Sequence, residues 1–257
     1  MKPVSRFAPL LAASLLCAAP VLAQTPPATA PAASTSTIEP GAVEALKRMS
    51  AYLGTLTSFE IKADAAFDLV LDDGQKVQML DRAVYKVRRP SGFVIERTSD
   101  YKDRRFYYDG KKLTVYSPRS AYYAQVDAPP TIRQTLDAVS ERYGIELPLT
   151  DLFRWSEPDG GRADQLKEAF YVGPSTIGGV TTDQYAFREA DVDWQIWISR
   201  GDAPVPRRVT IVDRSNPTQP QYTANLNWTL NPTFAPATFA FQPPKDALPI
   251  KLTAIGK

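Results

Sequence analysis

Apolar and polar side chains alternate along much of this 257-residue chain. Beginning at Ser58, one side of the alternation carries Phe59, Ile61, Ala63, Ala65, Phe67, Leu69 and Leu71. A period of two is typical of a strand that buries one face. Asp72-Asp73-Gly74 then signals a hairpin turn. The returning strand, residues 76–89, places on one face Val77, Met79, Ala83, Tyr85 and Val87.

The same pattern continues in two further groups of predicted strands. The first group covers residues 93–98, 105–108, 112–116 and 121–126. The second covers residues 169–176, 179–188, 194–199, 207–213 and 222–230, with a short piece at 239–241. Tight turns such as Asp109-Gly110-Lys111 join successive strands. Sequential hairpins of this kind predict an antiparallel meander.

Helical spacing occurs before the first strand and between the two groups. Residues 43–53 carry apolar side chains three or four positions apart after Glu39-Pro40-Gly41, and residues 132–143 do so after Pro129-Pro130-Thr131. Residues 147–155 are expected to form a further short helical or coiled segment. We therefore expect a mainly β (α+β) fold. Its curved antiparallel sheet forms a half-barrel wrapped over an N-terminal helix and a central helical segment.

The N-terminus predicts export. Lys2 and Arg6 precede an apolar run, and small residues surround a cleavage point after Ala23, so residues 1–23 are expected to be a signal peptide. Residues 24–37 are Pro, Ala, Thr and Ser-rich without charge, which predicts a disordered linker. Residues 38–257 then form a single domain. We expect a periplasmic protein with no integral membrane segment after cleavage.

Composition excludes several kinds of chemistry. The chain has no histidine, and its one cysteine, Cys17, leaves with the signal peptide, so His-based triads, His metal sites and thiol chemistry are excluded. Removing Lys2 and Arg6 leaves 28 basic against 28 acidic residues, a balance that argues against a nucleic-acid partner. We assign no catalytic residue, metal ligand or cofactor, and we expect a monomer.

Two acidic groups leave alternatives open. Glu189, Asp191 and Asp193 alternate before a strand and could hold calcium, although the glycine and terminal glutamate of a calcium loop are missing. Asp100, Asp103 and Asp109 could include a glycosidase-like carboxylate pair, which depends on a separation that sequence does not give. Exposed turn acids are the commoner explanation, and a carboxylate-based hydrolase ranks last among the functions we consider.

Two stretches resemble the periplasmic lipoprotein-carrier fold of the LolA/LolB type. One runs from Tyr85 through Arg89-Pro90 to Asp109-Gly110-Lys111 and Tyr116, and the other is the C-terminal stretch 231–244. More of the chain, residues 38–252, resembles a bacterial family of predicted periplasmic proteins. Three motifs carry this second resemblance: Asp103–Gly110, Tyr143–Leu149 and Asp193-Trp194-Gln195-Ile196-Trp197-Ile198. It implies a curved antiparallel half-barrel over helices with an apolar cavity.

The inward side of the alternation supplies the candidate ligand-binding residues. They are Phe59, Ile61, Phe67, Leu69, Val77, Met79, Tyr85, Phe93, Ile95, Trp194 and Ile196. These side chains either line an apolar cavity or fill a closed core, because both need the same period. The first hypothesis is a non-enzymatic periplasmic protein that holds an acyl chain, lipid or lipoprotein-type apolar ligand. The alternative is an interaction or sensor module with a filled core, whose partner is an envelope protein.

Overall fold

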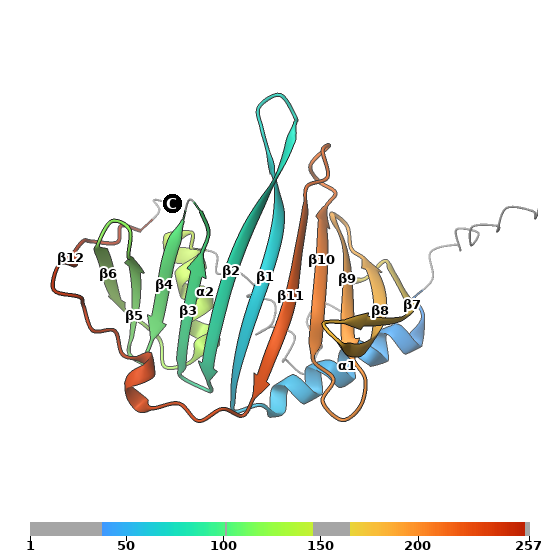
Figure 1. The fold of residues 1–257 in the computed structure, drawn as a ribbon, viewed down its shortest axis with the longest axis horizontal. Coiled ribbons are helices and arrows are strands. Elements are labelled where there is room, and N and C mark those ends of the chain that lie inside the picture. The colour runs from blue at the N-terminus through green and yellow to red at the C-terminus, as the bar shows by residue number, and fades with distance from the viewer. Residues whose placement is uncertain (1–37, 101, 146–164, 255–257) are drawn as a thin grey trace, which may run out of the picture. The chain divides into compact units, whose positions relative to one another are not determined.

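The computed structural model describes residues 38–100, 102–145 and 165–254, which form one large sheet with helices on one side (Figure 1). The first half of this part contains α1 (Pro40–Thr55), β1 (Ser58–Val70), β2 (Lys76–Arg88), β3 (Gly92–Thr98), β4 (Asp103–Tyr108), β5 (Lys112–Ser117), β6 (Tyr122–Asp127) and α2 (Ile132–Tyr143). The second contains β7 (Glu168–Ile177), β8 (Val180–Arg188), β9 (Val192–Ser199), β10 (Pro206–Asp213), β11 (Gln221–Leu230), a 3₁₀ helix (Pro236–Phe239) and β12 (Leu248–Pro249).

Two antiparallel meanders meet at the centre of the sheet. The strand order is β12-β6-β5-β4-β3-β2-β1-β11-β10-β9-β8-β7, so β1 pairs with β11 and joins the halves. Every pairing among these strands is antiparallel except the short β12–β6 contact. The sheet is open and curved, and the predicted mainly β fold with an antiparallel half-barrel over two helices is confirmed.

Both helices lie on the same face of the sheet, which we call the helix face; the opposite side is the outer face. α1 buries Ala42, Leu46, Met49 and Leu53, whose spacing of three or four residues places them on one side of the helix. α2 starts where the Thr131 side chain accepts a hydrogen bond from the Gln134 amide at 3.3 Å. Together with inward-facing strand residues, these helices form one hydrophobic core.

The C-terminal segment differs from the sequence prediction. Residues 239–241 do not form a strand, and the twelfth strand is instead Leu248–Pro249. Pro236–Phe239 form a 3₁₀ helix instead, and only residues 240–242 separate this helix from Pro243 and Pro244. The segment packs through its aromatic rings on the outer face: Phe241 lies 5.2–5.4 Å from the ring centroids of Tyr107, Tyr116 and Tyr123.

A long hairpin projects beyond the rest of the sheet (Figure 1). β1 pairs with β11 only as far as Phe67, and β2 pairs with β3 only from Arg82 onward. Residues 68–81 therefore have no strand neighbour other than β1 and β2 themselves, and we call them the arm. The predicted turn forms its tip, where Gly74 adopts a φ of +85° that favours glycine.

Candidate functional site

Small side chains occupy the centre of the helix face. Ala63 on β1 lies opposite Ala83 on β2, and Ala65 lies opposite Ala224 on β11. Three of the four are buried, with exposed fractions of 4% for Ala63, 7% for Ala83 and 0% for Ala224, whereas Ala65 is half-buried. We call these four residues the alanine strip. A methyl side chain fills little of the space above a sheet, so whatever covers the strip packs close to the backbone there.

A row of large side chains borders the strip on the side of the arm. Strand register places one residue from each of six neighbouring strands in this row: Met79, Phe67, Tyr222, Ile211, Trp194 and Phe187. The last two are buried and their rings stack with centroids 4.2 Å apart, whereas the first four are half-buried. We call this the aromatic row. It is packed at the β8 and β9 end and more open toward β1 and β2.

Exposure of apolar surface increases from the aromatic row onto the arm. Leu69 and Val77, which lie opposite each other, are 45% and 37% exposed, and Leu71 is 40% exposed. These residues share the helix face of the hairpin with Phe67 and Met79. The apolar side of the core thus continues into an exposed apolar surface on the arm. Contiguous exposed apolar patches mark binding sites on protein surfaces.

One acidic side chain interrupts this apolar surface. Asp81 lies on β2 between Met79 and Ala83 on the helix face, directly opposite Ala65, and is only 7% exposed. The Arg97 Nε on β3 donates to Asp81 Oδ2, while Oδ1 is buried without a hydrogen-bond partner. A buried carboxylate needs such compensation, because removing it from water costs several kcal/mol. Asp81 and Arg97 therefore form a polar centre at the border of the alanine strip.

Two tyrosines stand beside this polar centre with neutral hydroxyl groups. Burial, and after it the negative charge of Asp81, raises the pKa of Tyr222 to about 12, although Arg97 acts in the opposite direction. Burial also raises the pKa of Tyr85. Both hydroxyls therefore keep their protons at neutral pH and add no charge near Asp81.

The raised pKa of Tyr222 predicts a loss of stability in alkali. Unfolded tyrosine ionises near pH 10, whereas folded Tyr222 stays neutral to about pH 12. The contribution of Tyr222 to the free energy of unfolding is thus complete below roughly pH 10 and is lost as the pH rises toward 12. We expect Tyr222→Phe to lose less stability than wild type across this window, measured by urea unfolding at each pH. Identical pH profiles for both proteins would contradict the raised pKa.

A hollow lies between α1 and the strands β8 and β9, with a volume of about 510 Å³. Its walls are partly polar and include Arg48, Asp183 and Arg200. Arg200 binds both carboxylate oxygens of Asp183, at 3.0 Å from Nε and 2.6 Å from Nη2, and the Tyr171 hydroxyl donates to the same carboxylate at 2.9 Å. These bonds lower the pKa of Asp183, so it is a paired anion rather than a proton donor.

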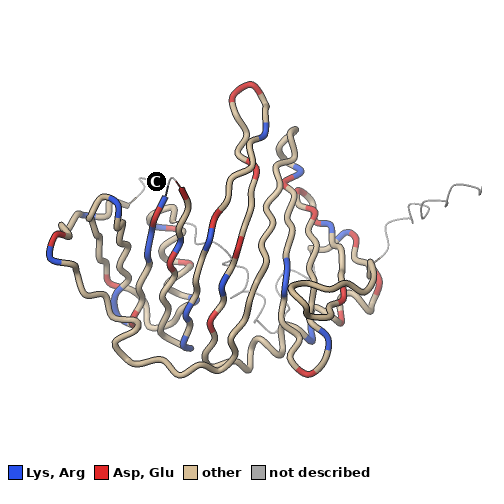
Figure 2. The backbone as a smooth tube through the Cα atoms, viewed as in Figure 1, with Lys and Arg blue, Asp and Glu red and all other residues tan. Residues whose placement is uncertain are grey.

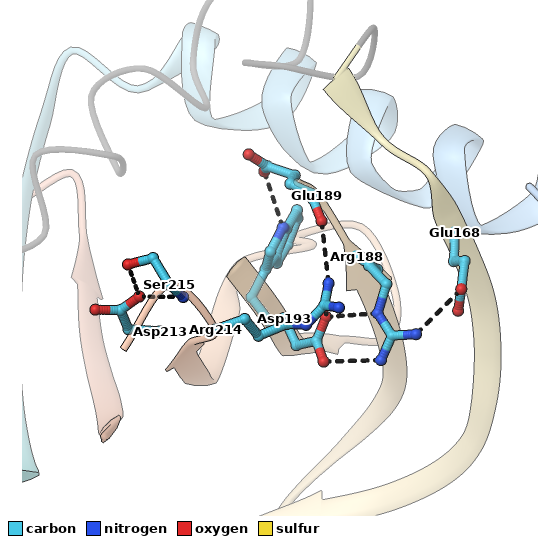
Figure 3. Close-up of polar contacts among 8 residues, drawn as sticks. Glu168, Arg188, Glu189, Asp193, Asp213, Arg214 and Ser215 are labelled. Atoms are coloured by element: carbon cyan, nitrogen blue, oxygen red, sulfur yellow. Dashed lines mark hydrogen bonds and ion pairs between the residues drawn. The ribbon is translucent and has the colours of Figure 1, made fainter. Parts of the chain in front are cut away.

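Two members of the acidic run at the start of β9, Glu189 and Asp193, are engaged in contacts within the protein (Figure 3). Arg188 donates to both oxygens of Asp193, at 2.8 and 2.9 Å, and to Glu168 at 3.1 Å. The Trp194 indole donates to Glu189 at 3.1 Å. The Arg188 hydrogen bonds hold the pKa of Asp193 below its usual value. Within residues 38–100, 102–145 and 165–254, no group of three or more acidic side chains is arranged to hold a metal ion.

The carboxylates considered for hydrolysis do not form a pair with Asp109. Asp103 begins β4 and Asp109 follows its end, so they are separated by about 20 Å along an extended strand. Asp109 accepts hydrogen bonds from the amides of Lys111 and Lys112 at 2.9 and 2.8 Å, as a turn residue does. This arrangement gives the Asp109 carboxylate a structural role.

Comparison with protein families identifies the chain. Residues 42–253 match the model of a family described as predicted periplasmic protein (DUF2092). The chain belongs to this family. The match confirms the second resemblance found in the sequence, and the family description agrees with the expected compartment. No protein with a curated description matches.

Several solved structures resemble this DUF2092 protein at low identity. An uncharacterized conserved protein from Thermus thermophilus is 11% identical with a TM-score of 0.47, covering 82% of this chain and 99% of its own. LprF from Mycobacterium bovis is 14% identical with a TM-score of 0.45, covering 83% and 100%. A LolA superfamily protein from Nitrosomonas europaea is 10% identical with a TM-score of 0.37, covering 81% and 99%. Values this low carry no function to the DUF2092 chain.

The structure separates the eleven candidate residues into two groups. Seven are buried at 8% exposure or less and belong to the hydrophobic core: Phe59, Ile61, Tyr85, Phe93, Ile95, Trp194 and Ile196. Four lie on or at the base of the arm and are half-buried or exposed: Phe67, Leu69, Val77 and Met79. Phe67, Met79 and Trp194 come together in the aromatic row, whereas Phe93 and Ile95 lie farther along the sheet. Contact of any of them with a ligand stays a prediction.

Sequence reasoning missed the polar centre of this DUF2092 protein. The alternation Val77, Met79, Asp81, Ala83 places an acid at an inward position of β2, and that anomaly is visible in the sequence. The contribution of Ala224 and Arg97 comes from strand pairing that sequence does not state. Among the described helices, none combines the length and apolar character needed to cross a bilayer. The predicted segments 1–23, 24–37 and 147–155 lie outside the described residues.

Proposed function

We propose that this DUF2092 protein binds an acyl chain or similar apolar ligand in the periplasm and performs no chemistry on it. The alanine strip carries the proposal. Exposure along β1 rises from Ala63, which is buried, through Ala65 and Phe67, which are half-buried, to Leu69, which is 45% exposed. An extended apolar molecule lying on this path would enter over the arm and end above the small side chains of the sheet.

The energy for such binding comes from apolar burial. Each methylene group removed from water contributes about 0.8 kcal/mol, so a chain of several methylenes needs no polar contact for affinity. The arm residues Leu69, Leu71 and Val77 would become buried in the same step, which adds to the gain. Specificity would then depend on chain length and on any group carried at the end of the chain.

The state of the carboxylates supports a role without catalysis. Asp183, Asp193 and Asp213 have lowered pKa values, caused first by side-chain hydrogen bonds from Arg200, Arg188 and Ser215. A carboxyl group that acts as a general acid at neutral pH needs a raised pKa instead. These groups are held as anions in structural pairs.

Native extraction tests the proposal directly. The protein would be purified from the periplasm without detergent, extracted with organic solvent, and the extract analysed by mass spectrometry; the intact mass would also report cleavage after Ala23. We expect acyl species near one molecule per protein, displaceable by a fluorescent fatty acid. A clean extract together with no binding of the fluorescent fatty acid would overturn the proposal.

The exposed arm favours one other function. Leu80 is 67% exposed, and residues 76–81 of β2 have no neighbouring strand on their outer edge. An unpaired strand edge can accept a strand from another protein. An envelope protein bound at this edge would make the chain an interaction module. The organic extract of the purified protein would then contain no acyl species, and removal of the arm would abolish the complex with the envelope protein.

A further inference from the structure

Two arginines face each other at the end of the alanine strip. Arg97 on β3 is directly opposite Arg104 on β4, and the alternation of both strands places them on the helix face with Ile95 and Phe106. Like charges directly opposite in a sheet are destabilising. Asp81 offsets the charge of Arg97, whereas Arg104 is exposed and has no carboxylate partner among the described residues.

Lys102 adds a third positive charge to this pair. It lies in the turn before β4, where burial, Arg104 and Arg97, in that order, lower its pKa, with Asp81 opposing them. The turn is held in shape, because Ser99 donates its amide to the Lys102 carbonyl at 2.7 Å and the Arg119 guanidinium donates to the carbonyls of Ser99 and Asp100. Figure 2 shows the basic residues in this upper part of β4, next to β3.

The protein supplies too little negative charge for three cations. Asp81 is engaged by Arg97, and Glu96 and Asp103 lie on the outer face by strand alternation. In the described part of the chain, no ion pair joins Arg104 or Lys102 to a carboxylate. Lys102, which is half-buried, and Arg104, which is exposed, thus have no carboxylate partner and lie near a carboxylate whose Oδ1 is buried without a partner.

This cluster adjoins the proposed binding path. Asp81 is opposite Ala65 in the strip, and Arg97 is opposite Ala83, so the cations begin where the small side chains end. A ligand with its chain on the strip would bring its terminal group to the cluster. This region thus combines the apolar alanine strip, the adjacent cations, and Asp81 Oδ1 as a hydrogen-bond acceptor without a partner.

We propose that Arg97, Lys102 and Arg104 bind the anionic headgroup of an acyl-chain ligand, and that Asp81 Oδ1 accepts a hydrogen bond from a donor on the same headgroup. This inference rests on the proposed function and names its ligand class: an amphiphile with a phosphate or carboxylate at one end. Arginine and lysine recognise such oxygens through charge-assisted hydrogen bonds. The ligand supplies the negative charge that the cluster lacks.

Two ligands with the same acyl chain test the inference: lysophosphatidic acid and the corresponding monoacylglycerol, which lacks the phosphate. We expect the wild-type protein to bind lysophosphatidic acid at least about tenfold more tightly, a difference that salt reduces. The double variant Lys102→Gln/Arg104→Gln should reduce this preference to about twofold or less and leave monoacylglycerol binding unchanged. Arg82→Gln is the matched control, because Arg82 is on β2 but pairs with Asp64, and both are well exposed.

The outcomes separate the inference from the proposed function. Equal binding of both ligands, unaffected by the double variant, would leave apolar binding in place and overturn the headgroup site. An equal loss for both ligands in the double variant would also overturn it, since the cations would then support the fold rather than the headgroup. Failure of the wild type to bind either ligand would overturn both. Tight binding of inorganic phosphate alone would assign the cluster to a free anion and overturn the acyl-chain ligand.

Discussion

Replacement of Phe93 by alanine is expected to lower the free energy of unfolding by about 3 to 5 kcal/mol, the cost of removing a fully buried aromatic ring. Phe93 has 0% exposure, and its ring centroid lies 5.2 Å from that of Tyr108. The cavity left behind cannot collapse easily, because Val87 and Tyr108 flank it on neighbouring strands. Urea unfolding monitored by circular dichroism measures the change.

Leu69→Ala is the matched control for Phe93→Ala. Leu69 is 45% exposed on the arm, so its truncation should change stability by no more than about 0.5 kcal/mol. A cost below about 1 kcal/mol for Phe93→Ala would instead mean that Phe93 borders open space. It would then be a cavity-lining residue, as the first hypothesis from sequence has it, and not part of the packed core.

Ala65→Trp is expected to weaken acyl-chain binding by at least about tenfold, or ~1.4 kcal/mol. Ala65 is half-buried on the helix face, opposite both Ala224 and Asp81. An indole at this position would occupy the room above the alanine strip. The affinity is measured with a fluorescent fatty acid, and far-ultraviolet circular dichroism checks that the fold persists.

Ala66→Trp provides the control for steric bulk. Ala66 is the next residue on β1 and is also half-buried, but its side chain lies on the outer face. The Ala66→Trp variant should bind the fluorescent fatty acid with unchanged affinity. Unaltered affinity in a folded Ala65→Trp protein would place the ligand elsewhere, with the hollow between α1 and β8–β9 the next site to test.

Local patterns determined most of the secondary structure of this protein. The alternation from Phe59 to Leu71 predicts β1, and the Asp-Gly turn predicts the bend into β2, because both depend on neighbouring residues only. α2 is predicted with the bounds that it has, since Thr131 and Gly144 cap it. The prediction for residues 239–241 is wrong because Phe239 belongs to the 3₁₀ helix that begins at Pro236, and Phe241 packs its ring against tyrosines of the outer face.

Tertiary structure decided which inward residues are buried and which remain exposed. Phe59 and Leu69 hold equivalent places in the same alternation, yet β11 and β2 flank the first whereas the second projects on the arm. Strand pairing also brings Arg97 to Asp81 and opposite Arg104, contacts that depend on the register of the β2–β3 and β3–β4 hairpins. The sequence by itself determined a histidine-free, mainly β protein with an apolar inner face. Only strand pairing created the alanine strip and the charged cluster, because the register of β2, β3 and β4 sets the neighbours of Asp81 and Arg97, and the distant strand β11 contributes Ala224.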